Sequence, residues 1–319
     1  MKNVVKRVMV VLLLTVLVVT SFSQEFPRKP VTVICPMAAG GGTDAVLRAL
    51  SREAEKFLGQ SIIVSDNPGA GGAIGHSAML QSPNDGYYVG MITFELNSLP
   101  PQGLVPFSYK DFDPLMMVNQ DASALTVKAD APYNNIAEFI AYAKANPDKL
   151  TIGNAGPGSV WHVAAGLMAD TAGIKVIHVP FDGGAPAATA LVGGHVNAVT
   201  VSVAEVQGHV QAGALKILGI MDTKRNELFP NVPTFKEQGL DLVFGTWRGL
   251  AVPKGVKPEI REKLAKAFKS AWDTENFTTF AKNSSLGLVY MNSEDFGAFL
   301  EKNYNEVSAV MKKIGLSKK

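Results

Sequence analysis

The sequence predicts an α/β protein built from two lobes. The chain has 319 residues, about twice the length of a typical single domain. Short β-branched runs alternate with amphipathic helical segments, a pattern typical of parallel βαβ units. Apolar residues make up 47 % of the chain and charged residues 18 %, which is enough to fill a large core and too little charge for disorder.

The first 23 residues are typical of a secretory signal peptide. Three bases in the first seven residues precede an apolar run at 8–19, and the small residues Ser21 and Ser23 follow it. The alternative is a membrane anchor, but a span needs roughly 20 apolar residues and this run is shorter. We therefore expect export and cleavage after Ser23.

The charge and cysteine content exclude several classes of protein. The formal net charge is +2, but the chain without residues 1–23 has 27 bases and 28 acids. A nucleic-acid-binding protein would show a clustered basic excess instead. Cys35 is the single cysteine, which excludes an intramolecular disulfide and a cysteine-rich metal site.

The first lobe is expected to begin with three strands separated by two helices. Thr43 is expected to cap the first helix, whose apolar residues follow a period of 3.6 up to Leu58, and Gly59 to end it. The expected strands are 30–35, 61–64 and 87–92, and the expected helices are 43–58 and 74–80.

The second lobe is expected to begin near residues 125–128 and to repeat the same alternation. Its first helix should start at Asn134 or Asn135 and stop before Pro147. The further elements are strands 151–153, 176–179, 196–203 and 215–220, and helices 161–169 and 186–191. The chain should then return through a strand at 249–253, and helices 258–272 and 293–314 should pack on the first lobe.

Glycine gathers in four of the turns that lead from a strand to a helix. These turns are 39–44, 69–72, 153–159 and 182–184. Ligands of open α/β sheets bind at such turns, where backbone approaches closely and helix N-termini favour anions. None of the turns fits the phosphate-binding pattern of NTPases or the dinucleotide-binding pattern Gly-x-Gly-x-x-Gly. We therefore expect a small anion, such as a carboxylate, and no cofactor.

An ordered set of motifs resembles the tripartite tricarboxylate transporter solute-receptor family, also called the Bug family. The motifs span residues 26–316 and comprise 28–32, 39–44, 59–60, 67–75, 83–87, 158–162, 179–186, 191–196 and 247–253. The resemblance implies a two-lobed, type II-like periplasmic binding protein whose lobes are mostly parallel sheets flanked by helices. It also implies a receptor that binds a small carboxylate in the cleft between the lobes, without chemical change. The carboxylate would pass to a membrane permease with a large and a small subunit.

The lobes are expected at 24–125 plus 248–319 and at 126–247, with hinges near 125–128 and 246–251. The resemblance implies a monomer in the periplasm that has no metal, cofactor, catalytic residue or nucleic-acid partner. It places the ligand carboxylate between the first two glycine turns, 39–44 and 67–72, where backbone amides and bridging waters hold it, and the second lobe supplies further side chains. The implied site residues are Ala39, Gly40, Gly41, Thr43, Asp44, Ala70, Gly71, Gly72, Ser159, His162, Asp182, Gly183 and Ser202.

Two departures from the family pattern bear on the ligand. Relatives that bind amino acids often carry an acid after the strand that corresponds to 198–201, whereas Thr200 and Ser202 here offer only hydroxyls. Arg248 occupies a position that varies among relatives. Both departures favour a di- or tricarboxylate over an amino acid.

A secreted serine hydrolase acting on a carboxylate ester or amide is the alternative function. Ser159 and His162 are three residues apart on one helix face, but no Gly-x-Ser-x-Gly motif is present. A sensory co-receptor would share the same binding site. The five histidines show no metal-binding spacing.

Overall fold

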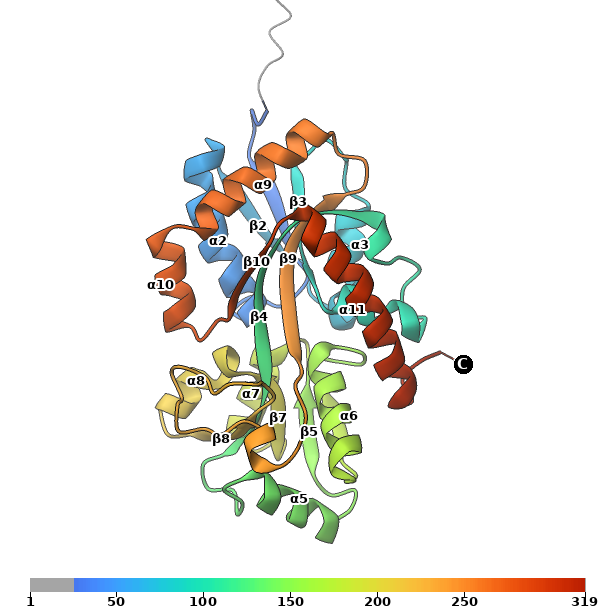
Figure 1. Ribbon diagram of the computed structural model, residues 1–319, viewed down its shortest axis with the longest axis vertical. Coiled ribbons are helices and arrows are strands. Elements are labelled where there is room, and N and C mark those ends of the chain that lie inside the picture. The colour runs from blue at the N-terminus through green and yellow to red at the C-terminus, as the bar shows by residue number, and fades with distance from the viewer. Residues whose placement is uncertain (1–25, 319) are drawn as a thin grey trace, which may run out of the picture.

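The computed structural model describes residues 26–318, and the expected signal peptide at 1–23 lies outside the described residues. The described chain forms two α/β lobes arranged along the long axis of the molecule (Figure 1). Among the described residues, no helix is both long enough and apolar enough to cross a bilayer.

The sheet of the first lobe is mixed. Its strands are β1 (Val31–Cys35), β2 (Ile62–Asp66), β3 (Tyr88–Thr93), β4 (Phe112–Lys128), β9 (Gly245–Pro253) and β10 (Leu288–Met291). The first three strands pair in parallel in the order β2-β1-β3. Next to β3 lies β9, which is antiparallel to it, followed by β4, which pairs with β10. The carboxyl ends of the three parallel strands therefore point toward the second lobe (Figure 1).

Helices cover both faces of this sheet. They are α2 (Gly42–Leu58), α3 (Ala73–Leu80), α4 (Glu95–Ser98), α9 (Pro258–Trp272), α10 (Glu275–Asn283) and α11 (Ser293–Lys313). Alternate residues of β1 point to opposite faces, so Val33 packs in one core with Leu47 and Phe268, from α2 and α9. Ile34 belongs to the other core, with Phe296 of α11.

The second lobe repeats the arrangement with fewer helices. Its strands are β5 (Thr151–Asn154), β6 (Ile177–Pro180), β7 (Ala198–Ser202) and β8 (Leu215–Ile220), and its helices are α5 (Ile136–Ala145), α6 (Val160–Ala172), α7 (Gly184–Val192) and α8 (Val203–Gln211). The order β6-β5-β7 is parallel, and β4 and β8 add to it in antiparallel pairs. As predicted, Asn135 caps α5, because its side chain accepts the Glu138 N–H at 2.8 Å.

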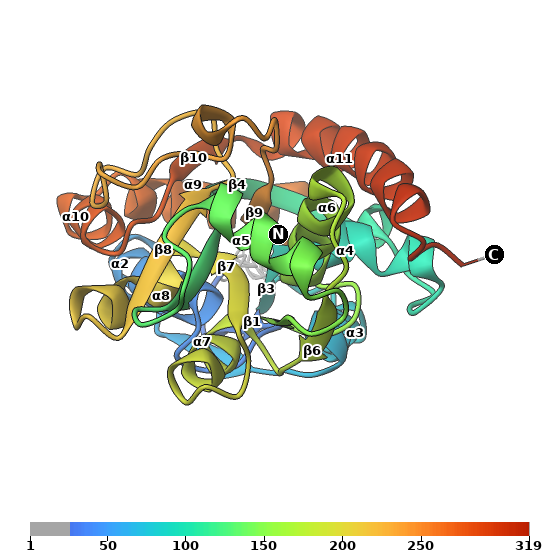
Figure 2. The same cartoon turned by 90° about the horizontal axis from the view of Figure 1, so that it is seen from below.

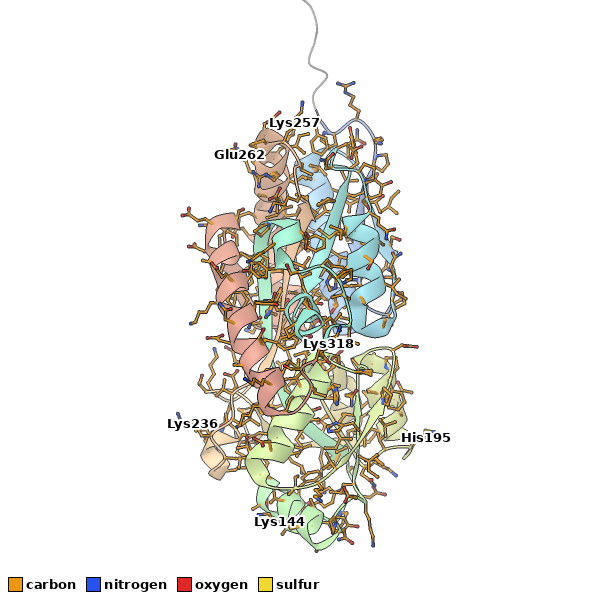
Figure 3. All side chains as sticks on the ribbon, turned by 90° about the vertical axis from the view of Figure 1, so that its right-hand side faces the viewer. Lys144, His195, Lys236, Lys257, Glu262 and Lys318 are labelled. Atoms are coloured by element: carbon orange, nitrogen blue, oxygen red, sulfur yellow. The ribbon has the colours of Figure 1, made fainter. Side chains whose placement is uncertain are left out.

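Two long strands join the lobes. β4 pairs with β9 as far as Ala122 and, from Ser123 onward, contributes to the sheet of the second lobe. In the view from below, β4 and β9 lie side by side behind the elements of the second lobe (Figure 2). The C-terminal part of α11 also reaches the second lobe, since Lys313 pairs with Asp170 of α6 at 2.9 Å. Charged side chains such as Lys144, Lys236 and Lys257 lie at the outer surface, as does His195 (Figure 3).

Three sequence-based expectations need correction. Thr43 does not cap α2: the N-cap is Gly41 and no side chain caps the helix, while the Thr43 hydroxyl accepts a bond from Arg248 Nε at 2.9 Å. The sheets are parallel in three strands each and antiparallel elsewhere, because β4 and β9 run between the lobes in opposite directions. Four elements were also not predicted from the sequence, namely α8, α10, β10 and the first half of β4. The first half of β4 is mostly buried on both faces and so lacks an alternating pattern.

Candidate functional site

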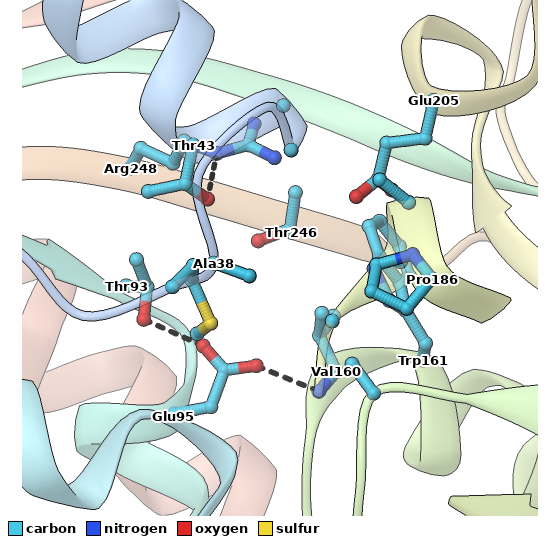
Figure 4. Close-up of a pocket in the computed structure, with 17 residues that line it drawn as sticks. Ala38, Thr43, Thr93, Glu95, Val160, Trp161, Pro186, Glu205, Thr246 and Arg248 are labelled. Atoms are coloured by element: carbon cyan, nitrogen blue, oxygen red, sulfur yellow. Dashed lines mark hydrogen bonds between the residues drawn. The ribbon is translucent and has the colours of Figure 1, made fainter. Parts of the chain in front are cut away.

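A cavity lies between the two lobes, beside the strands that join them. Its walls come from the start of α2, from Glu95 in α4, from the starts of α6 and α7, from Glu205 in α8, and from Arg248 in β9 (Figure 4). The cavity encloses about 420 Å³ of empty space, part of it open to solvent, and a water molecule's centre fits in about 30 Å³ of it. This narrow space suits a small molecule.

Two helix N-termini from opposite lobes meet at this cavity. Gly41 precedes α2 and Gly183 precedes α7, and no side chain caps either helix. A Cβ at Gly183 would lie 3.8 Å from the Cβ of Ala38, so the two turns face each other closely. Gly183 has a φ of 132°, which side chains rarely adopt. Because helix N-termini present N–H donors and a partial positive charge, the geometry of this pair is suited to an anion.

Arg248 lines the cavity, but its charge is already matched. Its Nη1 donates to Asp121, and both side chains are buried. Asp121 also accepts bonds from Asn119 Nδ2 at 2.8 Å and from the Gly287 N–H at 2.9 Å. Protein partners hold Nε and Nη1 of the guanidinium in place and Asp121 balances its charge, while Nη2 has no hydrogen-bond partner among the described residues.

Glu95 links the lobes across the cavity. It lies in α4 of the first lobe, and its Oε1 accepts the Val160 N–H of α6 at 3.0 Å, while its Oε2 accepts the Thr93 hydroxyl at 2.5 Å (Figure 4). Burial raises the pKa of this carboxyl, and these two hydrogen bonds act in the opposite direction.

Glu205 stands on the other wall. Its Oε2 accepts bonds from the Ser202 N–H at 3.2 Å and the Ser202 hydroxyl at 3.1 Å, a capping box at the start of α8. Burial raises the pKa of Glu205, and the positive charge of Arg248 lowers it in part. Neither glutamate was predicted from the sequence. The Ser-x-x-Glu spacing of the capping box could have indicated Glu205.

Ser159 and His162 are not arranged as a nucleophile and its base. Ser159 is fully buried, and its hydroxyl accepts the backbone N–H of His162 at 3.2 Å, which caps α6. The His162 Nδ1 accepts the Gly158 N–H at 3.1 Å. Burial lowers the pKa of His162 to about 4, with a further contribution from His178, so the ring is neutral at pH 7. These contacts hold the turn before α6 together and do not favour the hydrolase alternative.

The structure brings three of the expected site residues to the cavity wall, namely Gly41, Thr43 and Gly183. Four other expected site residues are exposed, namely Ala39, Gly40, Ala70 and Asp182. Asp44 accepts the Gly40 N–H at 2.8 Å and pairs with Arg48. Gly71 lies at the meeting of the lobes, where an added Cβ would be 3.3 Å from the Pro157 carbonyl oxygen, and Gly72 is buried beside it. Ser202 is buried under Glu205.

Cys35, Asp44 and Asp66 form a separate cluster whose polar atoms lie within 4.8 Å of one another. Burial raises the pKa of the Cys35 thiol to about 12, so it carries no charge at pH 7. Arg48 pairs with both carboxylates. The positive charge of Arg48 therefore balances the carboxylates of this cluster.

Comparisons with known proteins agree on one family. Residues 46–316 match the model of the tripartite tricarboxylate transporter family receptor. A protein of Cupriavidus necator, named UPF0065 protein in gbd 5'region, is 35 % identical over 93 % of this chain and 90 % of its own length.

Two solved structures share the fold. A TctC solute-binding protein from Polaromonas without ligand is 40 % identical, with a TM-score of 0.69 over 91 % of this chain and all of its own. MatC from Rhodopseudomonas palustris with bound malate is 27 % identical, with a TM-score of 0.83 over 89 % of this chain and 99 % of its own. The predicted two-lobed α/β fold of a solute-binding protein is confirmed.

Proposed function

Because the chain belongs to the tripartite tricarboxylate transporter receptor family, we propose that it is a periplasmic receptor that binds a small carboxylate between its lobes. It would deliver the carboxylate unchanged to a tripartite permease with a large and a small membrane subunit. The receptor acts as a monomer, and export follows from the signal peptide expected at 1–23.

One observation carries this proposal: the uncapped N-termini of α2 and α7 meet at the cavity between the lobes. An anion there receives backbone N–H donors from both lobes at once. The bound carboxylate therefore stabilises the closed arrangement, in which those donors lie together. MatC, which is similar to this chain, holds malate in its structure, which supports a carboxylate as the ligand.

The proposal includes movement of the two lobes, 24–125 plus 248–319 against 126–247. The chain superposes better on the malate-bound structure, at 27 % identity, than on the ligand-free one, at 40 % identity. This difference in structural similarity would follow if the lobes were closed in this protein and in the malate complex and more open in the ligand-free protein. β4 and β9, the strands that join the lobes, would carry the hinges.

The preference for di- and tricarboxylates does not follow from the cavity. That preference is based on the absence of an acid directly after β7 and on the presence of Arg248 at a position that varies among relatives. Glu95 and Glu205 now supply acids, and Asp121 matches the charge of Arg248. The proposal is therefore a small carboxylate, without restriction to those two groups.

Calorimetry on the chain from residue 24 onward tests the function. We expect at least one carboxylate of three to six carbons to bind at a stoichiometry of one and to be recovered intact by mass spectrometry. Saturation with that ligand should compact the protein in small-angle scattering and raise its melting temperature. Binding of none of these acids, or release of a cleaved product, would refute the proposal.

A further inference from the structure

The carboxyl group of Glu205 lies at the same helix starts that would hold the ligand carboxylate. A Cβ added at Gly184, the first residue of α7, would lie 2.2 Å from Glu205 Oε1, and one added at Gly42 of α2 would lie 3.8 Å from Glu205 Cδ. The side chain is directed into the cavity (Figure 4). A carboxylate bound there, as in the proposed function on which this inference rests, would therefore lie beside a second carboxyl group.

Two polar atoms at this place have no hydrogen-bond partner among residues 26–318. Ser202 donates both of its bonds to Glu205 Oε2, which leaves Oε1 without a donor. Arg248 is buried and uses Nε and Nη1 on protein groups, which leaves Nη2 free. A Cβ added at Gly42 would lie 3.2 Å from that Nη2. A ligand carboxylate that accepts a bond from Arg248 Nη2 thus lies close to the free oxygen of Glu205.

The ionisable side chains around this space carry more negative than positive charge. Glu205 is under the influence of Arg248 of β9 and of Asp121 of β4, and Glu95 lies across the cavity from it. Asp44 of α2 is in an ion pair outside the cavity wall, and α7 contains no ionisable residue. One guanidinium therefore faces three carboxyl groups before the ligand adds a fourth. In a closed space with little water, that excess of like charge is costly.

A proton on Glu205 Oε1 relieves the repulsion without breaking a protein contact. Two carboxylates that share a small site do not both ionise readily, so such a pair retains one proton. Oε1 is free to carry it and would then donate to the ligand carboxylate. Glu95 is less suited, because both of its oxygens already accept hydrogen bonds, from Thr93 and Val160. Burial also raises the pKa of Glu205, and the charge of Arg248 lowers it in part.

We propose that the receptor takes up one proton from the solvent when it binds a carboxylate, and that Glu205 Oε1 and the ligand carboxylate share this proton. In the open arrangement Glu205 faces water and is ionised at neutral pH. When the lobes close on the anion, one O–H bond forms within the pair and no bond of the ligand breaks. The proton returns to water when the ligand leaves. Because the complex holds more protons than the free protein, affinity falls as the pH rises.

Calorimetry in paired buffers measures this proton directly. Butyrate, malate, succinate and adipate are titrated into the chain from residue 24 onward, in PIPES and in imidazole, whose ionisation enthalpies differ. The difference in heat gives the number of protons taken up per bound acid, after correction for the proton that the free acid carries. At pH 6.5 we expect at least half a proton per bound acid and an affinity that falls about three- to tenfold per pH unit.

The variant Glu205→Gln assigns the proton to its residue. The amide oxygen keeps the bonds from Ser202, and the amide NH₂ group takes the place of the protonated Oε1. The variant should therefore bind the same acids without proton uptake, with an affinity that does not depend on pH, and more tightly than the unaltered protein at pH 8.5. A purely structural role would weaken binding equally at every pH. Glu262→Gln, at an exposed site of α9, is the control and should retain the uptake.

The outcomes separate this coupling from the proposed function. Acids that bind the unaltered protein without proton uptake anywhere between pH 5.5 and 8.5 refute the coupling and leave the receptor function standing. Uptake that persists in Glu205→Gln overturns the assignment to Glu205. If that variant does not fold, Glu95→Gln decides: uptake that is retained supports Glu205, and uptake that is lost moves the proton to the other wall. If no carboxylate of three to six carbons binds, the proposed function falls and the coupling falls with it.

Discussion

Three helices, α2, α6 and α7, begin with similar sequences but differ in how their first N–H groups are capped. Each follows a strand through a glycine-containing turn, and each borders the same cavity. No side chain caps α2 or α7, whereas Ser159 and Glu95 both accept N–H groups at the start of α6. Glycine therefore marks a turn that can approach a ligand. Whether the helix donors beyond it remain open to a ligand depends on the caps.

The largest effect should follow from filling the open start of α2. A Cβ at Gly42 would lie 3.2 Å from the Arg248 Nη2 and close to Glu205, so Gly42→Val places methyl groups where the ligand carboxylate binds. We expect at least a hundredfold loss of affinity by calorimetry, about 2.7 kcal/mol. The backbone there is helical, so the fold should remain intact by circular dichroism.

Gly208→Val in α8 is the matched control for this change. It is also a helical glycine, and nothing lies within 4 Å of an added Cβ. Ligand affinity should stay within twofold of the unaltered protein. A folded Gly42→Val variant that binds as well as this control would show that the open helix start is not the anion site.

A smaller loss should follow from removing the cap that crosses between the lobes. Glu95→Ala leaves the Val160 N–H without its partner whenever the lobes are closed. A hydrogen bond to a charged group contributes about 1.5–3 kcal/mol, so affinity should fall about ten- to a hundredfold. Small-angle scattering should show a more extended protein at equal ligand concentration. Unchanged affinity and unchanged compaction would mean that Glu95 does not stabilise closure.

Local patterns predicted the elements better than the site. Gly59 ends α2 and Asn135 caps α5 as expected, because each depends on neighbours within a few residues. The cavity depends on distant pairs: Arg248 and Asp121 are 127 positions apart, and Glu95 and Val160 are 65 apart. A single sequence carries no signal for such contacts, so neither the pairing of Arg248 with Asp121 nor the position of Glu95 in the cavity wall could be predicted.

The second cap of α6, which lies within one lobe, should affect stability instead of binding. Ser159→Ala removes an N-cap and should cost about 1 kcal/mol of unfolding free energy, or about 2 °C in melting temperature. Because Ser159 is fully buried and outside the cavity wall, ligand affinity should stay within twofold. Thr274→Ala, which removes the equivalent cap of α10, should destabilise the protein by a similar amount. A tenfold loss of affinity for Ser159→Ala alone would place its hydroxyl in the binding site after all.

The last effect concerns pH, because the turn before α6 uses a histidine as an acceptor and the turn before α2 uses Asp44. The pKa of His162 is about 4 in the folded protein and 6.5 when exposed, so the unfolded chain binds the proton more readily. The contribution of His162 to stability is therefore present above pH 6.5 and is lost as the pH falls toward 4.

The variant His162→Gln cannot titrate at this position. Its melting temperature should lie below that of the unaltered protein at pH 7.5, and the difference should shrink steadily down to pH 4.5. The pKa of the buried His76 is also lowered to about 4, but that group is common to both proteins and cancels in the difference. A difference that stays constant over this range would show that the neutral ring of His162 does not stabilise the capped turn.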